Sequence, residues 1–299
     1  EVENMNVIEG KKDRIFNAVI VAILTLCVLI CAYPLYLVVI NSFSDPSLVA
    51  KGEVYLYPRG FTLDAYKKAF TDGDLVQGYV NSLFYTVAGT ALNMLLTIPA
   101  AYALSKKRLY GRNFMMLVIV FTMYFSGGLV PAFLLMRGLN LVNTWWAIPL
   151  SGAVSATNLI IARTFFASGV PIELEEAAEI DGCGTVQTFL RVVLPLSKAM
   201  LSVILLYYAV ARWNNYTSAL YYLPMAPEKY PLQMVLRQLL VTMQETAIAE
   251  SSELAAYYAN LANQIKYAVI VIASLPLLVV YPFLQKYFEK GVMLGSVKG

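Results

Sequence analysis

Long apolar runs, separated by short polar stretches, are the feature that most limits what this chain can fold into. Runs of about 20 apolar residues or more suit helices that cross a bilayer, and we find six of them. Hydrophobic residues make up 59% of the chain and charged residues 14%, whereas a soluble domain has about 45–50% and about 25%. Only helices and closed barrels span membranes, and these runs are too long for barrel strands. The sequence therefore predicts an all-α membrane protein.

The whole chain, 1–299, is predicted to form one transmembrane domain with six spans. The spans cover about 15–40, 78–104, 114–136, 145–166, 198–221 and 263–287, and a polar loop covers 167–197. In the third span, Ser126-Gly127-Gly128 and Pro131 predict a break, and Pro149 predicts a break or kink in the fourth.

Six spans place both termini on one side of the membrane. In or beside the termini, the 105–113 loop and the 167–197 loop we count 13 Lys or Arg, against seven in the opposite loops. Because cytoplasmic loops carry the excess of basic residues, the N and C termini and the 167–197 loop are predicted to be cytoplasmic.

One segment, from Pro171 to Pro195, is strongly polar between apolar runs, and it carries five acidic residues. Pro171 suits the first position of a helix, and Gly182 follows the last residue of the helical pattern, where a left-handed cap is expected. A second amphipathic run follows Thr185, which can cap it. Two short helices joined by a glycine turn are therefore predicted. The residues alone fit either a helical hairpin on the membrane surface or a docking element for a partner.

The spacing within this segment resembles the EAA motif of bacterial ABC importer permeases. The family pattern is Glu-Ala-Ala, three residues, Gly, nine residues and Ile-x-Leu-Pro. Glu176-Ala177-Ala178, Gly182 and Val192-x-Leu194-Pro195 reproduce it, with Val192 in place of Ile. The resemblance implies the type I ABC importer permease fold, in a multi-pass protein of the bacterial cell membrane.

The same resemblance implies that this loop docks into a cytoplasmic ATPase and passes ATPase closure to the spans. In this role Gly182 turns the chain, and Leu194-Pro195 ends the second helix. The docking face is made or shaped by Glu176, Ala177, Ala178 and Asp181. The sequence holds no G-x-x-x-x-G-K-[ST] phosphate loop, so ATP and Mg would bind the partner ATPase and not this chain.

Two further stretches resemble the carbohydrate-uptake branch of these permeases. They are Met123 to Pro131 and the tail from Gly291 to Gly299, which are similar to the maltose-type second permease and, more closely, to the branch associated with complex oligosaccharides. The resemblance implies a carbohydrate substrate, a second homologous permease, a cytoplasmic ATPase dimer and an extracytoplasmic sugar-binding protein.

Polar and aromatic residues in the fifth span suggest a path for substrate. An intramembrane Arg is by default a functional residue, although Arg212 could also pair within the bundle or snorkel at the outer end. The Trp-Asn-x-aromatic stretch that follows it resembles a feature of carbohydrate importer permeases, and its aromatics could equally form an interfacial belt. Polar groups of other spans could line the path or join helices to one another. The candidates are Tyr124, Asn158, Arg212, Trp213, Asn214, Asn215 and Tyr216.

Other functional classes fit less well. A channel or an ion-gradient-driven secondary transporter is the alternative, but it would need buried carboxylates, and no Asp or Glu lies in the predicted spans. The chain has no His, the commonest metal ligand and proton shuttle, and no metal site or enzyme activity is predicted. The three cysteines do not suggest a disulfide framework, and a net charge of +3 is too small to suggest nucleic acid.

Overall fold

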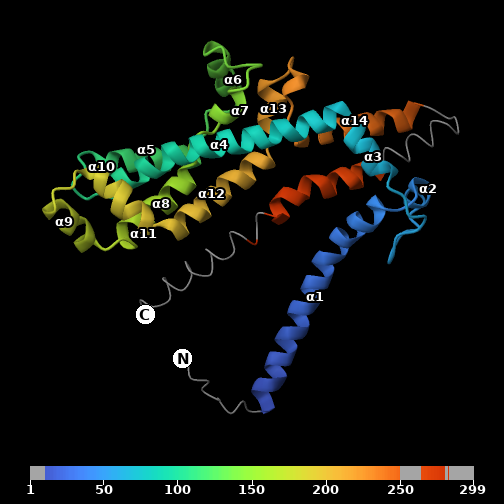
Figure 1. Ribbon diagram of the computed structural model, residues 1–299, viewed down its shortest axis with the longest axis horizontal. Coiled ribbons are helices and arrows are strands. Elements are labelled where there is room, and N and C mark those ends of the chain that lie inside the picture. Colours follow the sequence, from blue (N-terminus) through green and yellow to red (C-terminus); the bar gives the residue numbers. More distant parts are fainter. Residues whose placement is uncertain (1–10, 250–263, 280–281, 283–299) are drawn as a thin grey trace. The chain divides into compact units, whose positions relative to one another are not determined.

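The computed structural model describes residues 11–249, 264–279 and 282, and the regular elements in these ranges are helices (Figure 1). The predicted all-α class is therefore confirmed for this part of the chain. Contacts divide the chain into two compact units, Glu1–Ala69 with Met243–Val271, and Phe70–Thr242 with Ile272–Gly299. The 171–195 segment and all the candidate path residues belong to the second unit.

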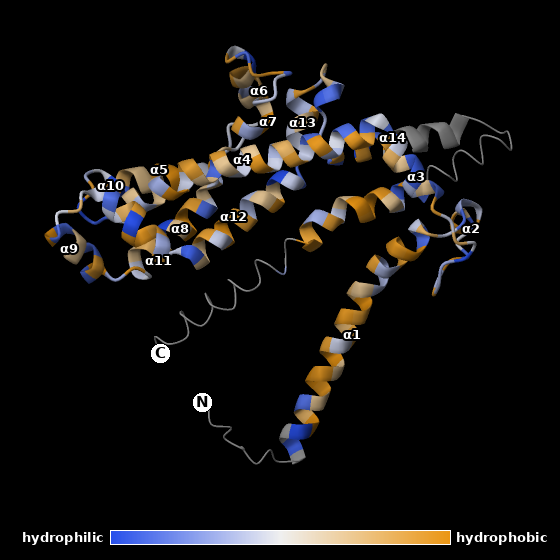
Figure 2. Ribbon diagram, in the orientation of Figure 1, coloured by the Kyte–Doolittle hydropathy of each residue, from blue (hydrophilic) through white to orange (hydrophobic). Residues whose placement is uncertain are grey.

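Helix α1 (Lys11–Ser42) is the main element of the first unit. Its stretch from Arg14 to Ser42 is long and apolar enough to cross a membrane, and none of its most apolar window is buried within the chain. In Figure 2 hydrophobic residues predominate along this helix beyond its hydrophilic start, which suits contact with lipid. After α1 come two short helices, α2 (Pro46–Ala50) and α3 (Asp64–Thr71).

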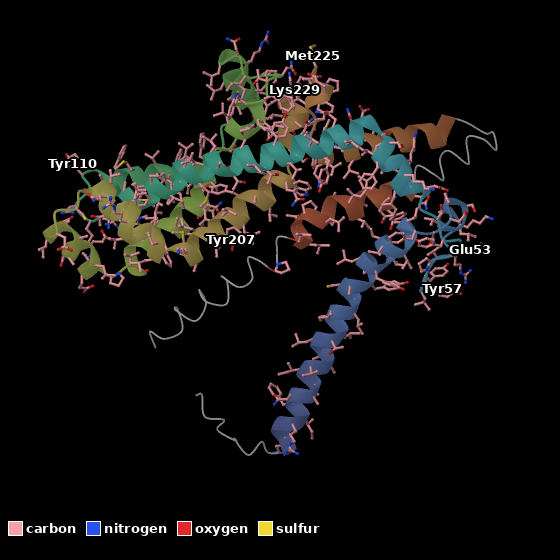
Figure 3. All side chains as sticks on the ribbon, in the orientation of Figure 1. Glu53, Tyr57, Tyr110, Tyr207, Met225 and Lys229 are labelled. Atoms are coloured by element: carbon pink, nitrogen blue, oxygen red, sulfur yellow. The ribbon has the colours of Figure 1, made fainter. Side chains whose placement is uncertain are left out.

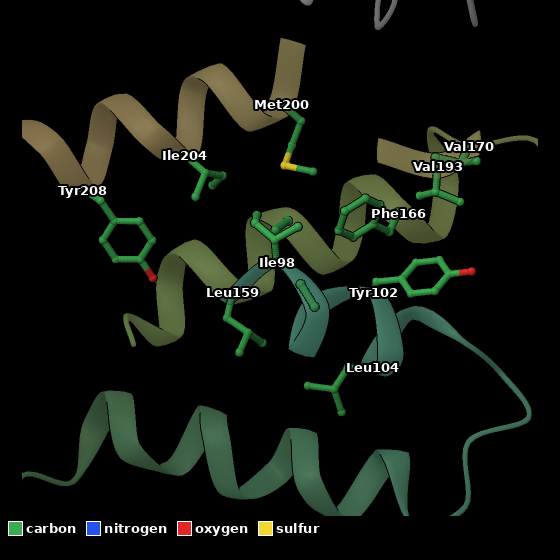
Figure 4. Close-up of a cluster of buried hydrophobic side chains, with 12 residues drawn as sticks. Ile98, Tyr102, Leu104, Leu159, Phe166, Val170, Val193, Met200, Ile204 and Tyr208 are labelled. Carbon is green, nitrogen blue, oxygen red and sulfur yellow. The ribbon is translucent and has the colours of Figure 1, made fainter. Parts of the chain in front are cut away.

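Helix α4 (Gly73–Ser105) is central to the second unit, and α8 (Ala156–Ser168) and α12 (Lys198–Trp213) pack along it (Figure 1). Apolar side chains from these helices are buried together with residues of the 171–195 segment (Figure 4). They include Ile98, Tyr102, Leu159, Phe166, Val193, Met200, Ile204 and Tyr208. One hydrophobic core therefore ties that segment to the three long helices.

Turns interrupt three of the predicted spans. The break expected at Gly127-Gly128 is confirmed, because α5 (Arg112–Tyr124) and α6 (Leu129–Gly138) are bent by 116° to each other. The predicted span 145–166 is also broken, just after Pro149, and the predicted span 198–221 is broken at 214–216. The first is divided into α7 (Ala147–Leu150) and α8, and the second into α12 and α13 (Thr217–Tyr222). The carbonyl groups freed at the end of α7 find a partner in Arg212.

By length and composition, two of the described helices could each cross a membrane, α1 and α4, or up to four spans if each bent pair counts as one. The last described helix, Gln264–Val279, is apolar but shorter. The remainder of the predicted sixth span, except residue 282, and the tail from Gly291 lie outside the described residues. Six spans therefore stay a prediction.

Segment 226–232, which contains the 3-10 turn η2 (Pro227–Lys229), is fixed to α4 by hydrogen bonds. The Asn81 amide donates to two of its carbonyls at 3.0 and 2.9 Å, and the Tyr85 hydroxyl donates to a third at 2.9 Å. Helix α14 (Leu232–Ala249) begins at this clamp.

Candidate coupling segment and polar cavity

The first helix of the 171–195 segment, α9 (Ile172–Ile180), ends in a glycine turn. Gly182 has φ +81°, so the predicted left-handed cap is confirmed. The N–H of Cys183 donates to the carbonyl of Ala178 at 2.9 Å, and the N–H of Gly182 donates to that of Glu179 at 3.0 Å. These two bonds form a Schellman motif, which satisfies carbonyls that the helix end would leave unpaired.

The starts of both short helices differ by one residue from prediction. Pro171 precedes α9 as its N-terminal cap and is not its first residue. Thr185 is the first residue of α10 (Thr185–Thr188), which has no side-chain cap, so the predicted capping role of Thr185 is wrong. The chain continues through a π-helical turn (Phe189–Val193) and α11 (Leu194–Leu196).

The second helix ends close to the predicted point. Leu194 and Pro195 lie in α11, and the helix stops one residue after Pro195. The buried hydroxyl of Ser197 donates to the carbonyl of Val193 at 2.7 Å. Helix α12 follows at an angle of 84° to the preceding helix. The segment and α12 are therefore joined by a sharp bend, which we call the elbow.

Two ion pairs hold α9 to the loop that follows α4. Lys106 pairs with Glu175, and Arg108 pairs with Glu179. The first pair is the better enclosed, with side chains 24% and 13% exposed. The Tyr102 hydroxyl also donates to Glu175 at 3.2 Å, and the Lys106 ammonium lies 4.3 Å from the Tyr102 ring centroid. The second pair is open to solvent, and the hydrogen bond with Glu179 raises the pKa of Arg108.

The opposite side of α9 is exposed in the described part of the chain. Ala178, at 7% exposed, packs inward and shapes this side from below. Ile180 is 86% exposed and Val186 is 71% exposed, which is unusual for apolar side chains in a polar loop. We call the exposed set the docking surface. It comprises Glu176, Ala177, Ile180, Asp181 and Val186.

The motif did not identify the residues that fasten α9 to the rest of the chain. The available signal was complementary charge, because the 105–113 loop is basic and the 171–195 segment is acidic. Which acid would meet which base depends on the tertiary fold.

Because the resemblance of this segment to the EAA motif implies a coupling role, replacing Glu175 with Gln should loosen α9 from the loop after α4 and lower transport. A partly buried hydrogen bond to a charged group contributes about 1.5–3 kcal/mol, so we expect uptake to fall about fivefold or more. The matched control is Glu179→Gln, whose pair is solvent-exposed and should contribute little. Transport at equal expression levels measures both. Equal losses in the two variants would contradict the assigned difference.

A cavity of about 570 Å³ with several polar side chains in its lining lies among α8, α12, α13 and the turn at 151–155. Three of the candidate path residues, Asn158, Arg212 and Asn215, line it. Four tyrosines also reach it, and Figure 3 shows one of them, Tyr207, on α12. Tyr124, Trp213, Asn214 and Tyr216 are not part of the lining.

Arg212 is 6% exposed, and all five of its N–H groups are used within the chain. Nε donates to Asn93 Oδ1 at 3.0 Å. The two terminal nitrogens donate at 2.7–3.1 Å to four backbone carbonyls at the end of α7, those of Ile148, Pro149, Ser151 and Gly152. Arg212 therefore pairs within the helix bundle, which is one of the alternatives that the sequence left open. We call this arrangement the Arg212 clasp.

Trp213 and Asn215 also have intramolecular partners. The buried indole of Trp213 donates to the carbonyl of Ala273 at 2.9 Å. The Asn215 amide bonds the side chain of Ser218 at 2.9 Å and accepts from its backbone N–H at 3.0 Å. Asn215 therefore stabilises the first turn of α13 while it lines the cavity.

Three other candidates are exposed. Tyr124 is the last residue of α5, Asn214 donates to the carbonyl of Val210 at 3.1 Å, and Tyr216 lies under the Arg237 guanidinium at 5.9 Å. Their surface placement leaves them open to contact with lipid or another subunit.

Asn158 differs from all of these. Only 8% of it is exposed, it lines the cavity, and its side-chain amide has no hydrogen-bond partner among the described residues. Asn158 is therefore the lining residue best suited to bind something in the cavity.

Comparison with known proteins places these features in context. The family model for the binding-protein-dependent transport system inner membrane component matches residues 75–294. The polygalacturonan/rhamnogalacturonan transport system permease protein YtcP of Bacillus subtilis is 42% identical over 96% of this chain and 100% of its own length. Protein LplC of the same organism is 41% identical over 97% of each chain.

A solved structure shares the fold. It comes from a bacterial ABC transporter involved in the import of the acidic polysaccharide alginate, and one of its chains superposes with a TM-score of 0.84 at 35% identity. The match covers 93% of this chain and 98% of that one.

Proposed function

This chain belongs to the family of binding-protein-dependent transport system inner membrane components, and we propose that it is one of two membrane-spanning permeases in an ATP-driven oligosaccharide importer. The resemblance to ABC importer permeases is confirmed by this membership. The family consists of transport permeases and not of enzymes, which fits a transport subunit. In the proposed arrangement six spans cross the bacterial cell membrane, with both termini in the cytoplasm.

The observation that carries the coupling role is the two-sided character of α9. One side is fixed to the loop after α4 by ion pairs, and the other presents the docking surface. We propose that a cytoplasmic ATPase dimer, which binds ATP and Mg, seats on this surface. Gly182 sets its shape, while Leu194 and Pro195 end the segment at the elbow into α12.

Force applied to α9 has a direct route to the cavity. The Lys106–Glu175 pair joins α9 to the end of α4, and the shared core joins α4 to α8 and α12. The last two helices carry Asn158 and Arg212 in the cavity wall. ATPase closure would thus move the walls of the cavity as well as the docking surface, which is what alternating access requires.

The cavity is suited to a carbohydrate. Tyrosine rings can pack on the C–H faces of a sugar, and amide and hydroxyl groups can bond its hydroxyls. Relatives are named for the transport of polygalacturonan/rhamnogalacturonan and of alginate. An extracytoplasmic sugar-binding protein would deliver the substrate. The exposed Tyr124, Asn214 and Tyr216 are proposed to complete the path with the second permease.

Purification of the tagged chain from its native membranes in mild detergent tests the proposal. We expect an ATPase and a second permease to co-purify, and ATP hydrolysis to respond to an oligosaccharide delivered by the binding protein. A chain that purifies alone under the mildest conditions, with no associated hydrolysis, would refute it.

A further inference from the structure

The loop that follows α2, residues 53–61, returns alongside α1 instead of extending away from it. The hydroxyl of Tyr36 donates to the carbonyl of Leu56, and the hydroxyl of Tyr33 donates to the carbonyl of Tyr55 at 3.4 Å. Both donors lie inside α1, well before its last residue. The loop is therefore held beside the helix and not beyond it, and we call it the return loop.

The depth of these two tyrosines in a membrane follows from the sequence of α1. Its apolar run begins at Ile15, directly after the basic Arg14. About 20 helical residues cross the hydrocarbon core of a bilayer, so a core that begins at Ile15 ends near Pro34. Tyr33 and Tyr36 then lie at the boundary of the core, where the amphipathic rings of tyrosine are enriched. The return loop is held at this level, beside the lipid headgroups.

The side chains at the tip of the return loop are large, apolar and exposed. Tyr55, Leu56 and Tyr57 are 61%, 70% and 60% exposed, and Tyr57 is labelled in Figure 3. A contiguous exposed apolar patch indicates contact with a protein or a membrane. This patch is continuous with the exposed apolar surface of α1, which suits lipid. Irregular backbone is excluded from the hydrocarbon core, so the headgroup layer is the part of the bilayer that the loop fits.

The base of the return loop is fixed to the end of α1. The N–H of Asp45 donates to the carbonyl of Arg59 at 2.9 Å, and the N–H of Arg59 donates to the hydroxyl of Ser44 at 3.1 Å. On the other arm of the loop, Val54 is buried. The tip is therefore presented by a preformed structure, which loses little conformational freedom when it meets a surface.

We propose that the return loop is an interfacial anchor, whose Tyr55, Leu56 and Tyr57 insert into the headgroup layer of the bilayer and fix the depth of α1. The partner is a lipid surface, because the loop is held at the boundary of the core and continues the lipid-facing surface of the helix. Such an anchor would keep α1 in place while other helices move during transport. The proposal concerns the membrane contact of α1 and does not depend on the substrate or on the coupling segment.

The test measures the depth of the loop in a bilayer. The tagged chain, purified with its associated subunits, is placed in nanodiscs of phosphatidylethanolamine and phosphatidylglycerol. Cys27, Cys31 and Cys183 are replaced by Ala, and one spin label is attached at Leu56→Cys or, as the matched control, at Lys51→Cys. Electron paramagnetic resonance gives the access of each label to oxygen, which concentrates in lipid, and to a water-soluble nickel chelate. We expect the label at 56 to lie at least about 5 Å deeper than the label at 51, the thickness of one headgroup layer.

Two results would overturn the anchor. A label at 56 that meets the nickel chelate as freely as the label at 51 would place the loop in water. A label shielded from both reagents would place it against a protein. Loss of oxygen access only when the extracytoplasmic sugar-binding protein is added would assign the loop to that protein, and the anchor would again be refuted.

Removing the two hydroxyl groups tests how the loop is held. In the double variant Tyr33→Phe with Tyr36→Phe, the rings remain but the bonds to the loop are lost, so the label at 56 should move towards water. The matched control is Tyr57→Phe, which removes a hydroxyl from the loop itself and should leave the depth unchanged. An unchanged depth in the double variant would show that α1 does not set the level of the loop.

Discussion

Replacing Gly182 with Arg is expected to reduce uptake to background while the protein still inserts and accumulates in the membrane. Gly182 lies at φ +81°, and a Cβ added there would meet no atom within 4 Å. A side chain in the left-handed region costs about 1–2 kcal/mol, which a packed membrane helix bundle tolerates. The Arg side chain would, however, stand beside Ile180 and Asp181 on the docking surface.

We expect Gly182→Arg to weaken the binding of the ATPase to this chain. A disrupted central contact of an interface costs about 2 kcal/mol or more, or about 30-fold in ATPase affinity. Measurements of uptake, of membrane levels and of ATPase recovered on the tagged permease would separate the three quantities. Normal uptake by Gly182→Arg would remove Gly182 from the coupling role.

Gly182→Asn is the matched control, because Asn adopts the left-handed conformation more readily than other residues with a Cβ. It should preserve the Schellman turn and add only a short neutral side chain. Most of the uptake should remain. If both variants lost uptake equally, the docking surface would tolerate no side chain at this position. The loss in Gly182→Arg would then not be due to the size and charge of Arg.

The sequence predicted best what depends on local rules. The glycine turn at Gly182 follows from helix-end chemistry, and α1 and α4 follow from their apolar length. Pro149 marked a break or kink in the fourth span, whereas the turn at 214–216 was missed because an apolar stretch gives no sign of where a helix stops. Breaks in a membrane helix persist only if another group satisfies the freed backbone, and at the end of α7 that group is Arg212, about 60 residues away in the sequence.

Some features of the candidate site were predicted and others were not, because the others depend on contacts between distant parts of the sequence. A motif of fixed spacing located the coupling segment, but it could not show that Ala178 faces inward or that Glu175 and Glu179 hold the helix in place. Composition drew attention to Arg212, Trp213 and Asn158 equally. Only the fold distinguishes the first two, whose polar groups are bonded within the chain, from Asn158, whose amide has no partner among the residues that the structure describes.

Gly89→Val should strongly destabilise the second unit. Gly89 lies in the middle of α4, where a Cβ would be 3.0 Å from both Cδ and Nε of Arg212. Five hydrogen bonds hold that side chain, so it cannot simply move aside. Displacing it would leave a buried charge and several carbonyls without partners, at a cost of about 3–5 kcal/mol.

Whether Gly89→Ala raises or lowers the Tm makes the test specific. In an ordinary helix interior, Gly→Ala stabilises by about 1 kcal/mol, and Gly73, in the same helix, has no atom within 4 Å of an added Cβ. Gly73→Ala should therefore be neutral or stabilising, whereas Gly89→Ala should lower the Tm of the purified complex and Gly89→Val should lower it further. If Gly89→Ala raised the Tm, the guanidinium would be free to shift, and the clasp would not be the rigid support that the broken helices and the cavity wall depend on.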